Sequence, residues 1–539
     1  MAVVARGAGA LLLGCCIVCS ASAQEGDAEA APTSAAAGGQ RLVDIFNYRI
    51  EGNSVLPQTE VERAVMPFLG PQRPVADVEA ARAALEKAYR DGGFETVGVE
   101  IPEQDVRGGT VRLNVTELKV GRLRVTNARH FSPDDIREAL PSLAEGRVPN
   151  YREVSREIAA ANKSSERLIM PSLRAGDTPD TVDVDLQVED KHPLHGSLEI
   201  NDRFSSRTER LRVSAGLRYA NMFQLGHTLS VQGQVTPTDP GQSWSVSGSY
   251  VAPIASSGFS VLGYAVKSNS DVSAVNGIGV LGTGEIYGAR GLYSFSTGTG
   301  AGTVIHQLTA GIDYKIFEES LIVGADAART PIDYFPATVQ YSAAQRTERY
   351  DLDMTLSANF GLRSLGATNA EFGLKRFNAS ASWFALRTDI GYLHKLRGDW
   401  RLGVRLSGQI ASGALISNEQ FSAGGLDSVR GYFESQELGD DGASFQLQMD
   451  SPLLLSKQGP IDELRLFAFT DGAVLHLRDP LSSQQGKTSL LSVGAGANLR
   501  LLGNLNMSSL LAIPLKQTDG VKTDIADTVR IQVRAWAEF

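Results

Sequence analysis

Cysteine is almost absent from the sequence. Only three of the 539 residues are cysteine, namely Cys15, Cys16 and Cys19. All three lie in residues 1–23, which also contain Arg6, an apolar run and the small-residue site Ala21-Ser22-Ala23. This pattern predicts a secretory signal peptide that ends at residue 23. The rest of the chain would contain no cysteine, which excludes disulfides and predicts a protein that works outside the cytoplasm.

Long apolar segments are also missing beyond residues 1–23. No other window approaches 18 uninterrupted apolar residues, so the sequence predicts no transmembrane helix. Lipid cannot hydrogen-bond to backbone groups, so an exported chain that crosses a membrane without helices must close as a β-barrel. The net charge of −10 comes from dispersed acidic residues and argues against nucleic acid as a partner.

Motifs for catalysis and cofactor binding are absent too. The sequence has no H-E-x-x-H, no G-x-S-x-G and no phosphate-binding Walker loop. "GIGVLG" (Gly277–Gly282) has the spacing of a dinucleotide loop, but no helix is predicted after it. "HPLH" (His192–His195) offers two histidines without an evident third ligand, and we interpret it as structural. We therefore predict no catalytic residue, no metal site and no cofactor.

What the sequence does contain begins with a repeat. After a small-residue linker at residues 24–41, residues 42–118 show strand and helix periodicities in the order β-α-α-β-β. The same order recurs in residues 119–191. Three apolar positions match at a constant offset of 75 residues: Leu56, Val61 and Val65 correspond to Phe131, Ile136 and Leu140. The pattern indicates two tandem α+β domains.

From His195 to Phe539 the helical periodicity gives way to alternation with period two. "WRLGVRLSGQIA", from Trp400, places its apolar and its polar residues on opposite faces, as strands of a transmembrane barrel do. We count sixteen strands, starting near residues 195, 209, 227, 243, 256, 284, 302, 334, 348, 378, 400, 443, 461, 487, 503 and 528. The sequence thus predicts an antiparallel barrel of sixteen strands over residues 195–539, wide enough for an aqueous channel.

The predicted connections alternate between short and long. Short turns such as "KLRGD" (Lys395–Asp399) alternate with long links, such as Val272–Gly284, Phe317–Tyr334 and Ala411–Gly442. In such barrels the short turns face the periplasm, so the tandem domains that precede the first strand should lie there. The longest connection carries "SVRGY", with Arg430 between Val429 and Gly431, and Tyr432 after them.

These features together resemble one family. The tandem domains resemble POTRA (polypeptide-transport-associated) domains, through "IEGNSVLP" (Ile50–Pro57) and "ARHFSPDDIREALPSL" (Ala128–Leu143). Followed by "HGSLEINDRFS" (His195–Ser205) and the VRGY tetrad in the sixth long loop, the chain resembles two-partner secretion transporters of the TpsB or hemolysin-activator type. The resemblance implies a mainly β outer-membrane protein: two periplasmic POTRA domains and a barrel into which residues 412–442 fold.

The resemblance also implies the site residues. In that family the arginine of the tetrad contacts an acidic residue of a Phe-x-Asp motif on the inner wall of strand 13. Here that motif is Phe469-Thr470-Asp471, and alternation places Phe469 and Asp471 on the lumen side. The terminal Phe539 resembles the signal read by the outer-membrane assembly machinery, and alternation along the last strand also predicts that it faces lipid. Residues 24–41 are too short and too rich in small and acidic residues to predict the plug helix of many relatives.

The function expected from the resemblance is export of an unfolded exoprotein, a β-helical adhesin or hemolysin, captured by the POTRA domains. We expect a monomer whose other partners are outer-membrane lipids and the assembly machinery, and we expect no enzymatic activity. The alternative is an insertase that assembles barrel proteins, although such proteins usually carry more POTRA repeats. A passive porin is a third reading, which the two polypeptide-docking domains argue against.

Overall fold

The computed structural model describes residues 42–106, 108–162, 166–206, 208–254, 257–275, 278–300, 302–323, 326–518 and 529–539. The predicted signal peptide and linker lie outside the described residues. Residues 42–91 and 97–116 belong to a first compact unit, distinct from the rest of the chain.

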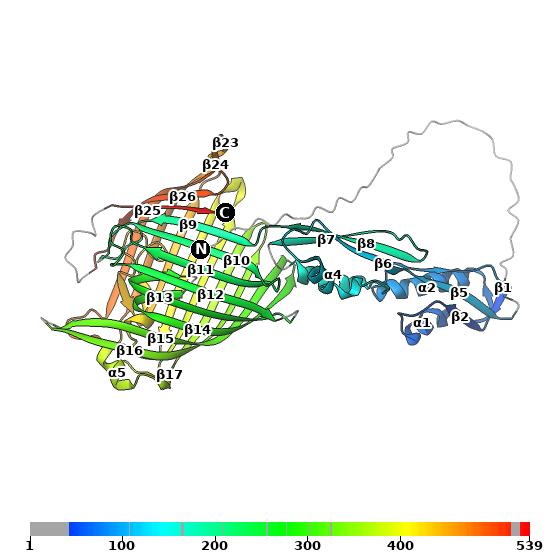
Figure 1. The fold of residues 1–539 in the computed structure, drawn as a ribbon, viewed down its shortest axis with the longest axis horizontal. Coiled ribbons are helices and arrows are strands. Elements are labelled where there is room, and N and C mark those ends of the chain that lie inside the picture. The colour runs from blue at the N-terminus through cyan, green and yellow to red at the C-terminus, as the bar shows by residue number, and fades with distance from the viewer. Residues whose placement is uncertain are drawn as a thin grey trace, which may run out of the picture. The chain divides into compact units, whose positions relative to one another are not determined.

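The first unit is a small sheet covered by two helices. Its elements are β1 (Leu42–Ile45), β2 (Asn47–Glu51), α1 (Gln58–Val65), the 3₁₀ turn Met66–Phe68, β3 (Gly70–Pro74), α2 (Ala76–Asp91), β4 (Val97–Glu100) and β5 (Thr110–Glu117). The sheet order is β2-β5-β4, with β2 parallel to β5, while β1 pairs with β3. Figure 1 labels β1, β2, β5 and the two helices. Helix α2 buries Val78, Ala81, Leu85 and Tyr89, the face that its sequence period predicts.

Residues 119–190 repeat this arrangement. The elements are β6 (Lys119–Thr126), α3 (Pro133–Glu138), the 3₁₀ turn Pro141–Leu143, α4 (Tyr151–Ala161), β7 (Arg167–Ala175) and β8 (Thr181–Asp190). The sheet order is β6-β8-β7, with β6 parallel to β8, so the central strand is again the last one. Ser132 and Asn150 cap the two helices through their side-chain oxygens. The six apolar residues of the 75-residue repeat are all buried.

The second part of the chain is a closed antiparallel barrel of sixteen strands, as the sequence predicts. Figure 1 labels β9 to β17 along the near wall. The sixteen strands are β9 (Leu194–Asn201), β10 (Arg212–Met222), β11 (His227–Val235), β12 (Trp244–Ile254), β13 (Phe259–Val275), β14 (Ile278–Thr299), β15 (Gly302–Val323), β16 (Asp326–Arg346), β17 (Tyr350–Gly366), β18 (Phe384–Lys395), β19 (Arg401–Ala411), β22 (Asp441–Asp450), β24 (Ile461–His476), β25 (Lys487–Leu501), β26 (Leu505–Pro514) and β27 (Arg530–Glu538). The short strand β23 (Leu455–Gln458) folds onto β24. Pairing of β27 with β9 closes the ring, so within the described residues the barrel has no free edge at this seam.

Two of the predicted long links are wrong. The segments Val272–Gly284 and Phe317–Tyr334 are mostly strand, because β13 with β14 and β15 with β16 continue as paired hairpins of 17 to 22 residues per strand. About 9–11 residues are enough to cross a membrane, so these strands are about twice that length. Hydrogen bonds between the strands satisfy the backbone without an apolar alternation, which is the signal that the sequence prediction relied on.

The long-loop end of the barrel carries a helix, α5 (Asn369–Lys375), between β17 and β18 (Figure 1). Thr368 and Glu371 form a capping box at its start, and Phe372 is buried against apolar residues of the neighbouring strands. Within the described ranges, no helix is both long enough and apolar enough to cross a membrane.

Candidate functional site

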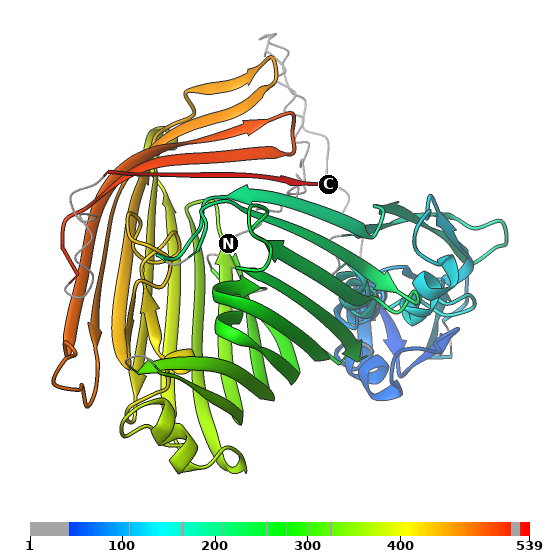
Figure 2. The ribbon, with the colours of Figure 1, turned by 60° about the vertical axis from the view of Figure 1, so that its left-hand side comes forward.

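The candidate site is the connection between β19 and β22, which lies inside the ring of strands (Figure 2). It covers residues 412–440 and ends two residues earlier than predicted, because β22 starts at Asp441. Short strands β20 (Phe421–Ala423) and β21 (Glu437–Gly439) pair with each other and form the base of the loop. Residues 424–436 form its tip, and this tip carries the VRGY tetrad.

The structure places Arg430 directly on Asp471. The Nε of Arg430 donates to Oδ2 of Asp471 at 2.7 Å, and its NH2 donates to Oδ1 at 2.8 Å. The backbone N–H of Arg430 also donates to Oδ2, at 3.0 Å. The Arg430 side chain is 8% exposed and that of Asp471 is 0% exposed, so the bidentate pair is almost completely removed from water.

Alternation along β24 explains why Asp471 is available inside the barrel. Leu466 and Val474, on the other face of this strand, are among the exposed apolar residues, whereas Phe467, Phe469 and Asp471 are buried. The Phe469 ring lies under the Arg430 guanidinium, with 3.7 Å between the ring centroid and Cζ. Arg430 NH1 donates to Oε1 of Gln448 on β22 at 2.6 Å. The wall therefore holds the planar cation on its face as well as on its edge.

The other residues of the tetrad fasten the tip to neighbouring strands. Tyr432 is buried, and its hydroxyl lies 3.0 Å from the carbonyl oxygen of Leu491 and 2.7 Å from that of Lys516. Val429 is fully buried in the same apolar cluster as Tyr432. Gly431 has φ +93°, and a Cβ there would come within 3.1 Å of the Ala512 side chain. Only glycine takes this backbone shape at this distance without strain.

A second set of ion pairs, which the sequence did not reveal, attaches the tip to the segment that follows β9. Arg203, just after β9, donates through Nε to Glu434 at 3.0 Å and through NH2 to Asp427 at 2.6 Å. The residue after Arg203 contributes as well, since its carbonyl oxygen (Phe204) accepts from the backbone N–H of Glu434. The tip thus contacts both β24 and the segment that follows the first strand. Arg203 lies within "HGSLEINDRFS", and the charged residues near the end of this segment are the sequence feature that could have indicated an ion pair.

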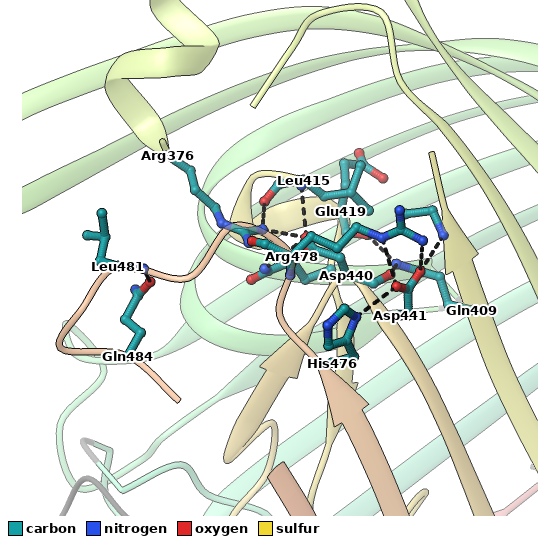
Figure 3. A network of polar contacts seen from close by, with 12 residues as sticks. Arg376, Gln409, Leu415, Glu419, Asp440, Asp441, His476, Arg478, Leu481 and Gln484 are labelled. Atoms are coloured by element: carbon teal, nitrogen blue, oxygen red, sulfur yellow. Dashed lines mark hydrogen bonds and ion pairs between the residues drawn. The ribbon is translucent and has the colours of Figure 1, made fainter. Parts of the chain in front are cut away.

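Two more buried carboxylates hold the base of the loop. Oε1 of Glu419, in the 3₁₀ turn Ser417–Glu419, accepts from Lys315 Nζ at 2.6 Å and from the Tyr334 hydroxyl at 2.7 Å. Asp440 accepts from Arg376 NH2 at 2.7 Å and from the backbone N–H of Arg478 at 2.7 Å (Figure 3). Both carboxylates are almost fully buried. Every one of these attachments is noncovalent, so the loop can be released without breaking a chemical bond.

Comparison with known proteins places this geometry in a family. The model of the haemolysin secretion/activation protein ShlB/FhaC/HecB family matches residues 180–501, which is more than half of the chain. The chain belongs to this family. The ShlB-type POTRA domain model matches residues 43–117, so the first predicted domain is a POTRA domain. The family consists of outer-membrane transporters of the two-partner secretion type, which favours transport over the insertase alternative.

The relatives agree with this assignment. The outer membrane transporter CdiB of Dickeya dadantii (strain 3937) is 24% identical over 396 residues, which are 67% of this chain and 64% of that protein. The chain therefore spans a little under two thirds of this curated relative. The structure of CdiB from Escherichia coli has a TM-score of 0.63 and 18% identity and covers 94% of this chain and 93% of that one. BamA from Haemophilus ducreyi lacking POTRA domains 1–3 has a TM-score of 0.55 and 14% identity, with coverage of 93% and 100%. The last two likenesses show the fold.

As a ShlB/FhaC/HecB-family transporter, the chain is an outer-membrane β-barrel with its POTRA domain in the periplasm. Phe539, at the end of the last strand, exchanges two backbone hydrogen bonds with Gly196 of β9, at 2.7 and 3.0 Å. Its ring is exposed on the outside of the barrel. Its expected recognition by the assembly machinery stays a prediction.

The two histidines of "HPLH" contact different residues. His195 Nε2 is 2.8 Å from Oε2 of Glu166, and the His192 ring contacts the ring of His130 edge-on, with centroids 5.1 Å apart. Among the residues that the structure describes, no group of three or more histidine, cysteine or acidic side chains could hold a metal ion. Both histidines contact other side chains of the described chain, and their structural interpretation stays a prediction.

Proposed function

We propose that this transporter captures an unfolded exoprotein in the periplasm through its POTRA domains and passes it through the barrel to the cell surface. Residues 119–191 would be the second POTRA domain, because they repeat the element order and strand order of the first. The exposed edges of such small sheets can take up an extended chain as an added strand. The expected substrate is a β-helical exoprotein of the adhesin or hemolysin type, and no enzymatic step is required.

The observation that carries the proposal is a barrel whose interior is occupied by its own loop, held by hydrogen bonds, ion pairs and apolar packing, all of them noncovalent. A segment of polypeptide occupies the lumen in this state, which supports passage of another polypeptide through the same interior. Arg430 and Asp471 would then act as the lock of the resting pore. Replacement of the loop by the exported chain, followed by folding outside, supplies a direction for transport without a nucleotide.

The first test is deletion of residues 42–118, with secretion of the cognate exoprotein measured in the medium. A very long β-helical protein encoded beside the transporter is the candidate substrate to co-express. We expect secretion to stop while the barrel still inserts, as shown by heat-dependent migration in gels. Deletion of residues 24–40 is the matched control and should leave secretion unchanged. Normal secretion without residues 42–118 would overturn capture by the POTRA domain.

A further inference from the structure

The loop inside the barrel is strongly acidic. Residues 412–440 contain a single basic residue, Arg430. They contain five carboxylates, namely Glu419, Asp427, Glu434, Glu437 and Asp440. A loop that only fills space has no need for a net charge of −4, the sum of these six charges. The partners of the carboxylates show what the charge does.

On one side of the barrel, the loop covers two cations of the wall. Lys315 on β15 and Arg387 on β18 both contact Glu419, at 2.6 and 3.2 Å. Lys315 and Arg387 stand on the polar face of their strands, which is the lumen face. The Lys315 side chain is 13% exposed and that of Glu419 is 2% exposed. The carboxylate therefore neutralises both cations and buries most of Lys315, while the Arg387 side chain stays 37% exposed.

The loop covers cations at two further places. Arg203 forms ion pairs with two of the carboxylates, Asp427 and Glu434, and its side chain is 21% exposed. Arg376, in the segment after α5, grips Asp440 with both terminal nitrogens (Figure 3). Four cations that belong to the barrel and its surface segments are thus paired with carboxylates of one loop. Arg430 forms the reverse kind of pair among these contacts: here the loop supplies the cation and the wall supplies the carboxylate of Asp471.

Displacement of the loop would leave these cations without their counter-charges. An unpaired cation in a confined lumen is unfavourable, so the open state favours any passing group that restores the pairs. A carboxylate on an extended polypeptide does so with the same geometry that Glu419 and Glu434 already show. We propose that Arg203, Lys315, Arg376 and Arg387 form a binding path for acidic segments of the exported polypeptide, and that the loop occupies this path as an internal substitute. This inference rests on the proposed function and adds the chemical class of the segments that the lumen binds.

The test is block of the ion current by peptides in planar bilayers. The full chain, with residues 412–440 replaced by a short Gly-Ser linker, is compared with the intact chain. Oligo-glutamate peptides added from the periplasmic side should block the linker variant at a concentration at least tenfold lower than oligo-lysine peptides of equal length. In the variant that also carries Arg203→Gln, Lys315→Gln and Arg387→Gln, this preference should fall severalfold, because Arg376 is then the one cation of the path that remains.

A matched control removes the same number of charges elsewhere. Arg346, Lys395 and Arg500 lie near the short turns and pair with other groups. Their replacement by glutamine in the linker variant should keep the preference for oligo-glutamate. Equal block by acidic and basic peptides, or equal loss of preference in the control, would overturn the inference. Inorganic phosphate that competes with the peptide as strongly as a second peptide does would overturn it too, because the path would then be a simple anion site.

A milder variant keeps the loop and changes one of its side chains. Glu434→Gln leaves Arg203 with one charged partner, so the concentration of oligo-glutamate needed for block should fall severalfold relative to the intact chain. No change in this variant, with a correctly inserted barrel, would count against the inference. The proposed function fails separately, through secretion that persists without residues 42–118, whatever the peptides do.

Discussion

Neutralising Asp471 is the sharpest test of the lock between loop and wall. Asp471→Asn keeps the shape of the side chain and removes its charge. The Arg430 guanidinium would remain buried beside Phe469 without a counter-charge. An amide NH2 group, which donates, would replace one of the two carboxylate oxygens that accept from Arg430. Removing one partner of a buried pair costs about 3–5 kcal/mol. Since each 1.4 kcal/mol is about a factor of ten, the population with a displaced tip should rise by roughly two to more than three powers of ten.

Hydrogen exchange measures this population directly. Amides of residues 424–436 should exchange faster in Asp471→Asn than in the parent, while the wall strands β24 and β25 keep their protection. Current recordings should show longer open times. Arg430→Ala should behave in the same way and should abolish export, because the loop can no longer return to its seat, while the barrel still inserts.

Asp389→Asn is the control for loss of a lumen carboxylate. Asp389 pairs with Arg405 and Ser407 and does not contact the loop. Its neutral variant should leave exchange of residues 424–436 unchanged. If Asp471→Asn and Asp389→Asn gave the same exchange rates and the same open times, the pair would not hold the loop, and the reasoning would be refuted. Normal secretion by Arg430→Ala would refute the role in export.

Two further predictions concern single groups. Tyr432→Phe removes the hydroxyl that contacts Leu491 and Lys516, so we expect the seated tip to lose about 1–3 kcal/mol, seen as faster proteolysis of the tip; an unchanged rate would exclude this anchor. Partial burial by itself raises the pKa of Asp190. The backbone N–H groups of residues 129–131 donate to its carboxylate and lower the pKa by more than burial raises it, so the pKa lies below the usual 3.8. Asp190→Asn should therefore lower the melting temperature of its domain at pH 7, measured by calorimetry of the full chain. The difference between variant and parent should vanish as the pH falls below 3.8 through the lowered pKa, because the parent carboxylate is then protonated. A difference that persists at that pH would contradict a charge effect.

Much of the fold could be predicted because its signals are local. Period-two alternation gave strand positions within a few residues for most of the barrel, and the offset of 75 residues revealed the tandem domains. The lumen position of Asp471 also follows from alternation along β24. Its pairing with Arg430 needed the family resemblance, because the two residues are 41 positions apart and belong to different elements.

The sequence by itself determined which residues can face lipid, which can face water, and where the chain must turn, since these depend on neighbours within one strand. The tertiary structure alone decided which charges meet. Arg203 and Glu434 are 231 positions apart and come together only because the barrel closes and the loop folds inward. Likewise, the ends of the long hairpins β13–β14 and β15–β16, which the sequence predicted as links, are strands through pairing of their backbones. Charge pairing and strand pairing beyond the membrane depend on closure of the whole ring, and no local pattern encodes that closure.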